Sequence, residues 1–262
     1  MKKIIETIKN IWKIEDLRTR LLTTFLFVLL YRFGTFVVLP GINPVDLAAL
    51  KSQTSGGLMA LLDMFSGGAF ANASIFALGI MPYISASIVV QLLSIMVPYF
   101  QKMQREGESG RRKMNQITRY LTVGILLLQA PSYLVNLNVQ LHQVGSSLPG
   151  GIWFTITSTI ILTAGSMFVM WLGERITDKG IGNGISFIIL IGIIARFPGA
   201  VIREFVSRFY ESGGGLVMFL LEIIFLFVVI AASIMLVQGT RRITVQYAKR
   251  VVGRKMYGGQ ST

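Results

Sequence analysis

Cysteine is absent from this chain of 262 residues, and histidine occurs only once. Without thiols the chain has no disulfide bond, no thiolate metal ligand and no cysteine nucleophile. The single histidine, His142, lies in a polar stretch with no second histidine to share a metal, so we expect a solvated loop residue. The residue types that most often bind metals or act as nucleophiles are therefore missing or isolated.

Charged residues are scarce as well. They make up 14% of the chain, whereas 53% of the residues are hydrophobic and the mean hydropathy is +0.64. Because a soluble domain carries about 25% charged residues, this composition predicts a membrane protein. The net charge of +13 is compatible with nucleic-acid binding, but the basic residues lie beside long apolar runs, where orientation in the membrane accounts for them.

Six apolar segments approach the roughly 20 residues that a helix needs to cross about 30 Å of hydrocarbon. They are residues 21–39, 73–97, 120–137, 152–172, 184–197 and 216–237. The fifth is short unless it continues past Pro198. The pattern predicts an all-α fold, a polytopic bundle of transmembrane helices.

The first 20 residues are basic and precede the first span. Their apolar positions have the spacing of an amphipathic helix that lies on the membrane surface: Ile4, Ile8, Ile11 and Trp12. We therefore expect residues 1–20 to form a cytoplasmic amphipathic helix.

The distribution of Lys and Arg indicates the orientation, because cytoplasmic loops are richer in both. With the N-terminus in the cytoplasm, most of the 25 basic residues fall on the inner side. The exceptions are Arg32, Lys51, Arg196, Arg203 and Arg208. Arg32 and Glu222 are ionisable residues near membrane depth, and both lie toward the outer ends of their spans. We expect their side chains to reach the interface.

The second span contains Pro82. A proline inside a helix removes a backbone donor and bends the helix, which frees the carbonyl near Leu78. In hydrocarbon such a break is tolerated only where it is buried in protein or faces a water-filled cavity, so it indicates a cavity. Ile80 and Ile84 flank the break on one helical face. They are either a hydrophobic constriction in an aqueous path or ordinary lipid and helix contacts.

Residues 58–72, between the first two spans, are half apolar and too short to cross the bilayer. Glycine pairs at 56–57 and 67–68 flank the helical part of this stretch and provide hinges. A half-length helix between hinges either folds into the mouth of a cavity as a movable stopper or lies at the interface outside it. The pattern leaves both interpretations open.

Four long motifs resemble the bacterial SecY family, whose members are the central subunit of a protein-conducting channel. They are MFSGGAFANASIFALGIMPYISASIVVQLL (64–93), EGESGRRKMNQITRY (106–120), MWLGERITDKGIGNGISFII (170–189) and RRITVQYAKRVVGRKMYGGQST (241–262). The motifs occur in the family's order and the resemblance covers essentially the whole chain. It implies an inverted-repeat channel of ten spans in two halves.

This chain would supply six of those ten spans, the first half of the inverted repeat plus one further span. The resemblance divides it into a five-span half at 21–197, an outer loop and sixth span at 198–240, and the start of a basic cytoplasmic loop at 241–262. It implies passage of unfolded secretory polypeptides across the bacterial plasma (inner) membrane and sideways release of membrane spans into lipid. It implies neither an enzyme nor a cofactor.

The resemblance also assigns residues to the parts of such a channel. The pore ring would include Ile80, Ile84 and Ile189. The plug at 58–72 would include Leu58, Leu61, Leu62, Met64, Phe65, Gly67 and Gly68. The lateral gate would include Ser85, Ser87, Gln91 and Gln129.

The last basic segment exceeds what orientation in the membrane requires, although contact with lipid headgroups is the simpler interpretation. Its residues for partner docking are Arg241, Arg242, Lys249, Arg250, Arg254 and Lys255. The resemblance implies docking of the motor ATPase SecA or of the ribosome, through rRNA phosphates, beside the small subunits SecE and SecG, signal sequences and lipid. Binding to rRNA through such a patch would be salt-sensitive.

Two other functions remain open from the residues alone. A secondary transporter of a small solute also uses broken helices and inverted repeats, but strongly polar residues at the midplane are scarce here. A membrane scaffold that only docks ribosomes is the other. The glycine-rich turn at 178–186 lacks the lysine and strand of a P-loop, and we interpret it as a cytoplasmic turn with Asn183 capping the fifth span.

Overall fold

The computed structural model describes residues 12–44, 47, 63–143, 145–210 and 215–240, and short strands between 245 and 261. The chain divides into two compact units, Met1–Pro198 and Gly199–Thr262. Most of the expected amphipathic helix at 1–20 lies outside the described residues, including Ile4, Ile8 and Ile11.

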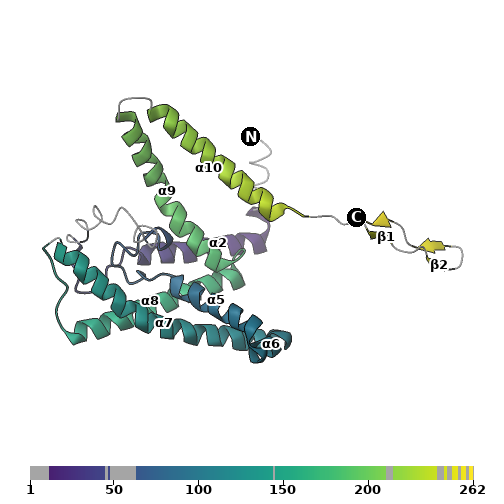
Figure 1. Ribbon diagram of the computed structural model, residues 1–262, viewed down its shortest axis with the longest axis horizontal. Coiled ribbons are helices and arrows are strands. Elements are labelled where there is room, and N and C mark those ends of the chain that lie inside the picture. The colour runs from purple at the N-terminus through teal and green to yellow at the C-terminus, as the bar shows by residue number, and fades with distance from the viewer. Residues whose placement is uncertain are drawn as a thin grey trace. The chain divides into compact units, whose positions relative to one another are not determined.

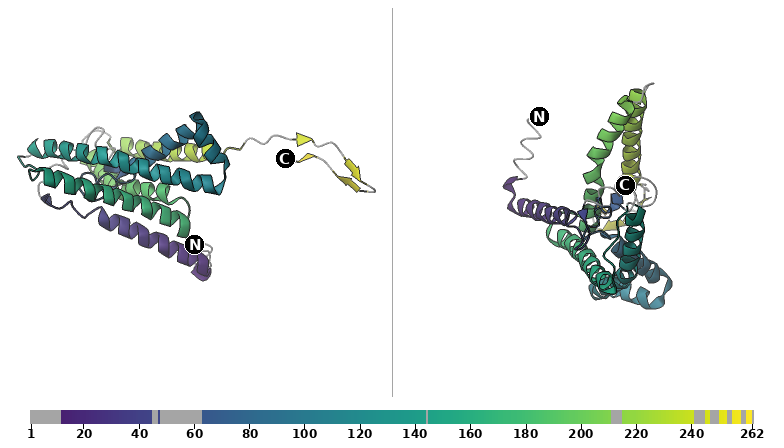
Figure 2. Two further views of the ribbon diagram at one scale, coloured as in Figure 1. Left: turned by 90° about the horizontal axis from the view of Figure 1, so that it is seen from below. Right: turned by 90° about the vertical axis from the view of Figure 1, so that its left-hand side faces the viewer.

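The first unit is a bundle of helices (Figure 1). Its helices are α2 (Glu15–Gly34), α5 (Met81–Met96), α6 (Pro98–Arg105), α7 (Glu108–Gln143), α8 (Ile152–Lys179) and the part of α9 (Gly184–Tyr210) up to Pro198. Helix α7 packs against both α5 and α8, and α2 packs against the other side of α8. In Figure 2, α2, α8 and α7 lie as neighbouring rods.

The second unit contains the end of α9, helix α10 (Gly215–Gln238) and four short strands. Strand β1 (Val245–Gln246) pairs with β4 (Gln260–Ser261), and β2 (Arg250–Val252) pairs with β3 (Lys255–Tyr257), both antiparallel. None of the residues of α10 is buried. The carboxylate of Glu222 binds Arg208 at 2.9 Å, and the expected position of Glu222 at the membrane interface stays a prediction.

Four helices in the described part of the chain are long and apolar enough to cross a membrane: α7, α8, α9 and α10. Helices α5 and α6 would add a fifth if they are one span bent by 98°. Helix α2 is not among them, because acidic and basic side chains fill its first turns and shorten its apolar part. The predicted transmembrane helix bundle is confirmed. The strand pairs near the end were not predicted.

Pro82 begins a helix and does not interrupt one. Helix α5 starts at Met81 with Pro82 in its first turn, so the expected break inside a helix, with a freed carbonyl near Leu78, is wrong. Proline is tolerated in a first turn because the N–H groups there have no intrahelical acceptor. Residues 66–80 form turns and one isolated bridge instead. The interruption is therefore longer than a proline alone would produce.

Small residues let the elements of this bundle approach closely. A side chain at Gly165 of α8 would collide with the carbonyl oxygen of Ile75, and one at Gly184 of α9 would collide with the carbonyl oxygen of Gly173. Glycine at such positions allows backbone to touch backbone, which is how membrane helices gain packing energy. The non-helical residues before α5 are thereby seated directly on α8.

Candidate functional site

The turn segment, residues 63–80, starts with a few helical residues at 63–65 and continues from 66 to 80 as turns and one isolated bridge, inside a bundle of membrane helices. Backbone polar groups at such a depth need partners within the protein. Part of the need is met locally, because the N–H groups of Gly68, Asn72 and Ser74 donate to the carbonyls of Asp63, Gly68 and Ala69. The carbonyls of Ser66 and Phe70 each accept one local N–H as well, from Ala69 and Ala73, and have a second lone pair for a donor from a neighbouring element.

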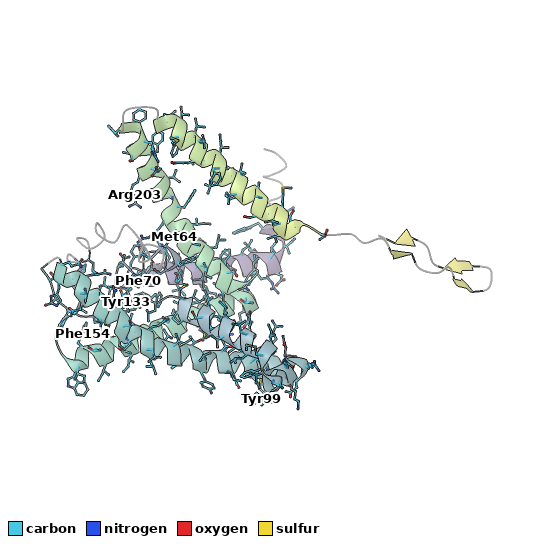
Figure 3. All side chains as sticks on the ribbon, in the orientation of Figure 1. Met64, Phe70, Tyr99, Tyr133, Phe154 and Arg203 are labelled. Atoms are coloured by element: carbon cyan, nitrogen blue, oxygen red, sulfur yellow. The ribbon has the colours of Figure 1, made fainter. Side chains whose placement is uncertain are left out.

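Side chains from two helices bind the carbonyls of the turn segment. The hydroxyl of Tyr31 on α2 donates to Ser66 over 3.2 Å, and the guanidinium of Arg32 donates to Gly67 over 2.6 Å. From α7, the hydroxyl of Tyr133 donates to Phe70 over 2.9 Å, and Figure 3 shows these two residues together. The side chain of Arg32 therefore contacts the turn segment. The sequence alone had suggested only that this side chain reaches the membrane interface.

Asp63 is the acidic centre of the turn segment and is only 4% exposed. One carboxylate oxygen accepts the N–H of Ala71 over 2.8 Å, and the other forms an ion pair with Arg196 of α9. The carboxylate therefore closes the first half of the segment on itself and joins it to a helix. Sequence reasoning missed both charged partners, although an acid and a base next to apolar runs were a usable signal.

The second half of the segment is attached by main chain. The N–H of Leu39 donates to Ala73 over 2.9 Å, and the N–H of Ile75 donates to Val37 over 3.0 Å. Between them lies an isolated antiparallel bridge from Val38 to Ser74. This half is therefore paired like a short strand with the residues that follow α2.

Gly67 and Gly68 occupy a left-handed backbone conformation, with φ of 65° and 95°. A Cβ at Gly67 would lie 3.0 Å from the Cα of Gly192, and one at Gly68 would lie 2.8 Å from a guanidinium nitrogen of Arg196. Both positions therefore require glycine for the backbone angle and for space.

The plug assigned to 58–72 is described only from residue 63 onward. Leu58, Leu61 and Leu62 lie outside the described residues, as does the glycine pair at 56–57. Met64, Phe65, Gly67 and Gly68 belong to the turn segment, and Met64 is partly exposed at 36%. The plug remains a prediction that the described part neither tests nor contradicts.

The three isoleucines of the expected pore ring come together in one apolar cluster. Ile80 is buried, and Ile84 and Ile189 pack against the same cluster while remaining partly exposed. Sequence reasoning missed the rest of this cluster. The aliphatic members come from α8 and α9, namely Val169, Leu172, Ile176 and Ile188, and the others come from α2 and the turn segment, namely Tyr31, Ala69 and Phe76. The chain thus gathers aliphatic side chains from α5, α8 and α9 around Ile80, the last residue of the turn segment.

Two pockets with both polar and apolar lining contain the residues assigned to the lateral gate. Ser85 and Gln129 line a pocket of about 280 Å³ with Ser66, Ser132 and Asn136. Ser87 and Gln91 line a second pocket of about 520 Å³ farther along α5, beside the start of α7. The structure therefore brings the four together in pairs, one pair in each pocket.

An ion pair between two helices and a helix cap are two further polar features. Arg119 of α7 binds Glu174 of α8 over 2.6 Å. The side-chain oxygen of Asn183 accepts the N–H groups of Ile185 and Ser186 at 3.1 and 3.3 Å, which confirms its predicted cap of α9. His142, expected in a loop, lies in the last turn of α7 and is exposed.

The side chains of the basic docking segment lie outside what the structure describes. Arg241, Arg242, Lys249 and Arg254 are not described, and Arg250 and Lys255 are placed only as backbone of β2 and β3. Within the described residues, no group of three or more His, Cys, Asp or Glu side chains could hold a metal ion. The polar contacts found are hydrogen bonds and ion pairs between protein groups.

A family model described as SecY matches residues 74–262. The protein translocase subunit SecY of Pseudomonas aeruginosa is 45% identical over 250 residues, which cover 95% of this chain and 55% of that protein. The subunit from Escherichia coli is 42% identical and is covered to 56%, and the one from Buchnera aphidicola (subsp. Acyrthosiphon kondoi) is 42% identical and is covered to 69%. The chain spans about half the length of most of these relatives.

A solved structure described as "The structure of a protein conducting channel" has the same fold. It superposes with a TM-score of 0.59 at 18% identity, over 92% of this chain and 52% of that one. At this identity the likeness establishes the arrangement of helices.

Proposed function

The chain belongs to the SecY family, and from this membership we propose that it is part of a channel that passes unfolded secretory polypeptides across a membrane and releases membrane spans sideways into lipid. The observation that carries the proposal is the turn segment. From residue 66 to residue 80 it is non-helical chain inside a helix bundle, next to a cluster of aliphatic side chains. Such chain is tolerated where it is buried in protein or lines a water-filled path.

Ile80, Ile84 and Ile189 are proposed to contribute to the pore ring. Aliphatic side chains in an aqueous path exclude ions because a narrow apolar constriction loses its water. The same side chains accept many passing residues, because dispersion contacts have no directional requirement. No covalent step is needed, so we propose no enzymatic activity for the chain itself.

Residues 58–72 are proposed to form the plug on the outer side of that ring. Support comes from the described part of the stretch, residues 63–72, which precedes Ile80 by a few residues in the chain and is attached to α2 and α9 by side chains. Deleting residues 58–72 should raise resting conductance without abolishing transport. Because the deletion also leaves Tyr31, Arg32 and Tyr133 without acceptors, point substitutions are the cleaner test.

The pocket of Ser85 and Gln129 is proposed to lie on the wall of the lateral gate. Its neutral hydroxyl and amide groups can hydrogen-bond to a passing backbone and then release it. A secondary transporter of a small solute is the other candidate function. The relatives named as translocase subunits favour the channel.

The partners and the membrane are also proposals. We propose the bacterial plasma (inner) membrane with the N-terminus in the cytoplasm, where most of the basic residues would then lie. SecE, SecG, SecA and the ribosome are the proposed partners, with the basic residues from 241 onward as the docking segment for SecA or the ribosome. Reversing Arg241, Arg242, Lys249 and Arg250 should weaken SecA or ribosome binding more than membrane insertion. Equal binding by the reversed protein would return these charges to a role in orientation.

Ion conductance of vesicles that contain the complete channel assembly tests the main proposal. Ile84→Ser should raise resting conductance, because a hydroxyl rewets the constriction. Ile95→Ser is the matched control on the same helix, since Ile95 is 70% exposed and belongs to neither apolar cluster. Equal conductance of both variants and the parent would refute the pore ring.

A further inference from the structure

Asp63 and Arg196 form an ion pair whose two members are unequally buried. The side chain of Asp63 is 5% exposed and that of Arg196 is 38% exposed. A buried carboxylate without a cation is costly, whereas a half-exposed guanidinium can turn to water. Asp63 therefore depends on Arg196 more than Arg196 depends on Asp63.

The pair connects two different elements. Asp63 begins the turn segment, and Arg196 lies in the part of α9 that belongs to the same compact unit. The same carboxylate also accepts the N–H of Ala71, eight residues later in the chain. One side chain thus joins the beginning of the first half of the segment to its end and joins both to α9.

The other contacts that hold this half are of a different kind. Tyr31, Arg32 and Tyr133 all bind backbone carbonyls, and a carbonyl can exchange such a donor for water. A buried carboxylate that loses its cation keeps its charge in an apolar place. The ion pair is therefore the contact whose loss most strongly favours movement of the segment.

We propose that Asp63 and Arg196 are a latch: the ion pair holds residues 63–71 against α9, and its separation releases them. The latch itself is a property of the turn segment. Only its consequence rests on the proposed channel function, because separation of the ion pair would then open the path that the plug closes. The proposal makes Asp63 and Arg196 positioning residues, because neither needs to touch the transported polypeptide.

Hydrogen–deuterium exchange of the complete assembly, followed at residues 63–71, measures release without reference to transport. Arg196→Gln should speed exchange there by about tenfold or more, since it leaves a buried acid unpaired. Asp63→Asn should have a smaller effect, because the amide oxygen still accepts the N–H of Ala71. The double variant should exchange no faster than Arg196→Gln alone, because the acid that it would have stranded is gone.

Two substitutions serve as controls. Arg196→Lys keeps the charge and should stay close to the parent protein. Arg203→Gln removes an arginine that donates to the carbonyl of Gly199 on its own helix, and it should leave exchange at 63–71 unchanged. If Arg196→Gln also matches the parent, or if the effects of the two single substitutions simply add in the double variant, the latch is overturned.

General unfolding of Arg196→Gln would raise exchange in α8 as well and would be visible there. In that case the Asp63→Asn variant is the deciding test. If residues 63–71 exchange as slowly in this variant as in the parent protein, the latch is overturned. Conductance of the same variants separates the two proposals. Faster exchange with raised conductance supports both, whereas faster exchange with unchanged conductance keeps the latch and contradicts the plug.

Discussion

Tyr133 and Phe70 meet in two ways at once. Their rings stand edge to face with centroids 4.9 Å apart, and the hydroxyl of Tyr133 donates to the carbonyl of Phe70 over 2.9 Å. One tyrosine of α7 therefore fixes both the side chain and the backbone of the same residue in the turn segment. Tyr133 itself is 5% exposed, and the same carbonyl of Phe70 also accepts the N–H of Ala73 over 3.2 Å.

Tyr133→Phe should lower the free energy of unfolding by about 0.5–1.5 kcal/mol, the net contribution of one hydrogen bond, because the carbonyl of Phe70 keeps the N–H of Ala73 as a donor at 3.2 Å. The ring contact should survive, because the phenyl group keeps its place. Chemical unfolding in detergent measures the change. Tyr120→Phe is the control, since Tyr120 is on the same helix and 77% exposed, and a loss as large there would contradict the role given to the hydrogen bond.

Gly165→Ala should destabilise the protein by several kcal/mol or prevent assembly, because the new methyl group would collide with the carbonyl oxygen of Ile75. Gly124→Ala in the middle of α7 meets no atom within 4 Å and should stabilise the helix by about 0.5–1 kcal/mol. Thermal unfolding of the two variants compares them directly. Similar melting temperatures would disprove the close seating of the segment on α8.

Gly68→Ala should loosen the turn segment through two effects, an unfavourable left-handed backbone and displacement of the guanidinium of Arg196. Gly107→Ala isolates the first effect, because Gly107 has φ of 73° and open space around it. The backbone effect alone costs about 1–2 kcal/mol. Hydrogen–deuterium exchange at residues 63–71 should rise in Gly68→Ala only. Unchanged exchange in Gly68→Ala would show that the guanidinium of Arg196 can move aside without loosening the segment.

Arg119→Gln should cost little, about 0.2–1 kcal/mol, although its ion pair with Glu174 is short. The side chain of Arg119 is 47% exposed and that of Glu174 is 24% exposed, so water and salt screen the pair. Unfolding at low and at high salt tests this, because the difference between parent and variant should shrink as salt rises. A large, salt-independent loss would show that the pair is shielded from solvent.

The starts of three helices could be predicted closely from hydropathy. Apolar runs beginning at 152, 184 and 216 correspond to helices that begin at Ile152, Gly184 and Gly215. The remaining helix boundaries were predicted less accurately. Hydropathy marks only the residues inside the hydrocarbon layer, whereas a helix can extend beyond that layer. Helix α7 begins at Glu108, within a charged stretch that the apolar pattern could not include.

The site was harder to predict because its contacts are long-range. The apolar pattern at 73–97 gave no sign that residues up to Ile80 are turns, since buried turns can be as hydrophobic as a helix. Pro82 was a true signal of a boundary, but a boundary and an interior break look alike in one sequence. Arg32 reads as an interfacial residue until Gly67, far along the chain, is known to lie beside it.

The two halves of the turn segment are attached by different kinds of bond, and this has a mechanical consequence. Residues 63–71 are held to the rest of the bundle mainly by separate side chains, whereas residues 73–75 are paired by main chain with residues 37–39. Ala73, at the start of the paired half, is the one non-glycine residue with a positive φ, 44°, in the described part of the chain. The N–H groups of Ala73 and Ser74 donate to the carbonyls of Phe70 and Ala69, so main-chain bonds also join the two halves to each other. A movement of residues 63–71 away from the paired half therefore has to open these two bonds as well as the side-chain contacts.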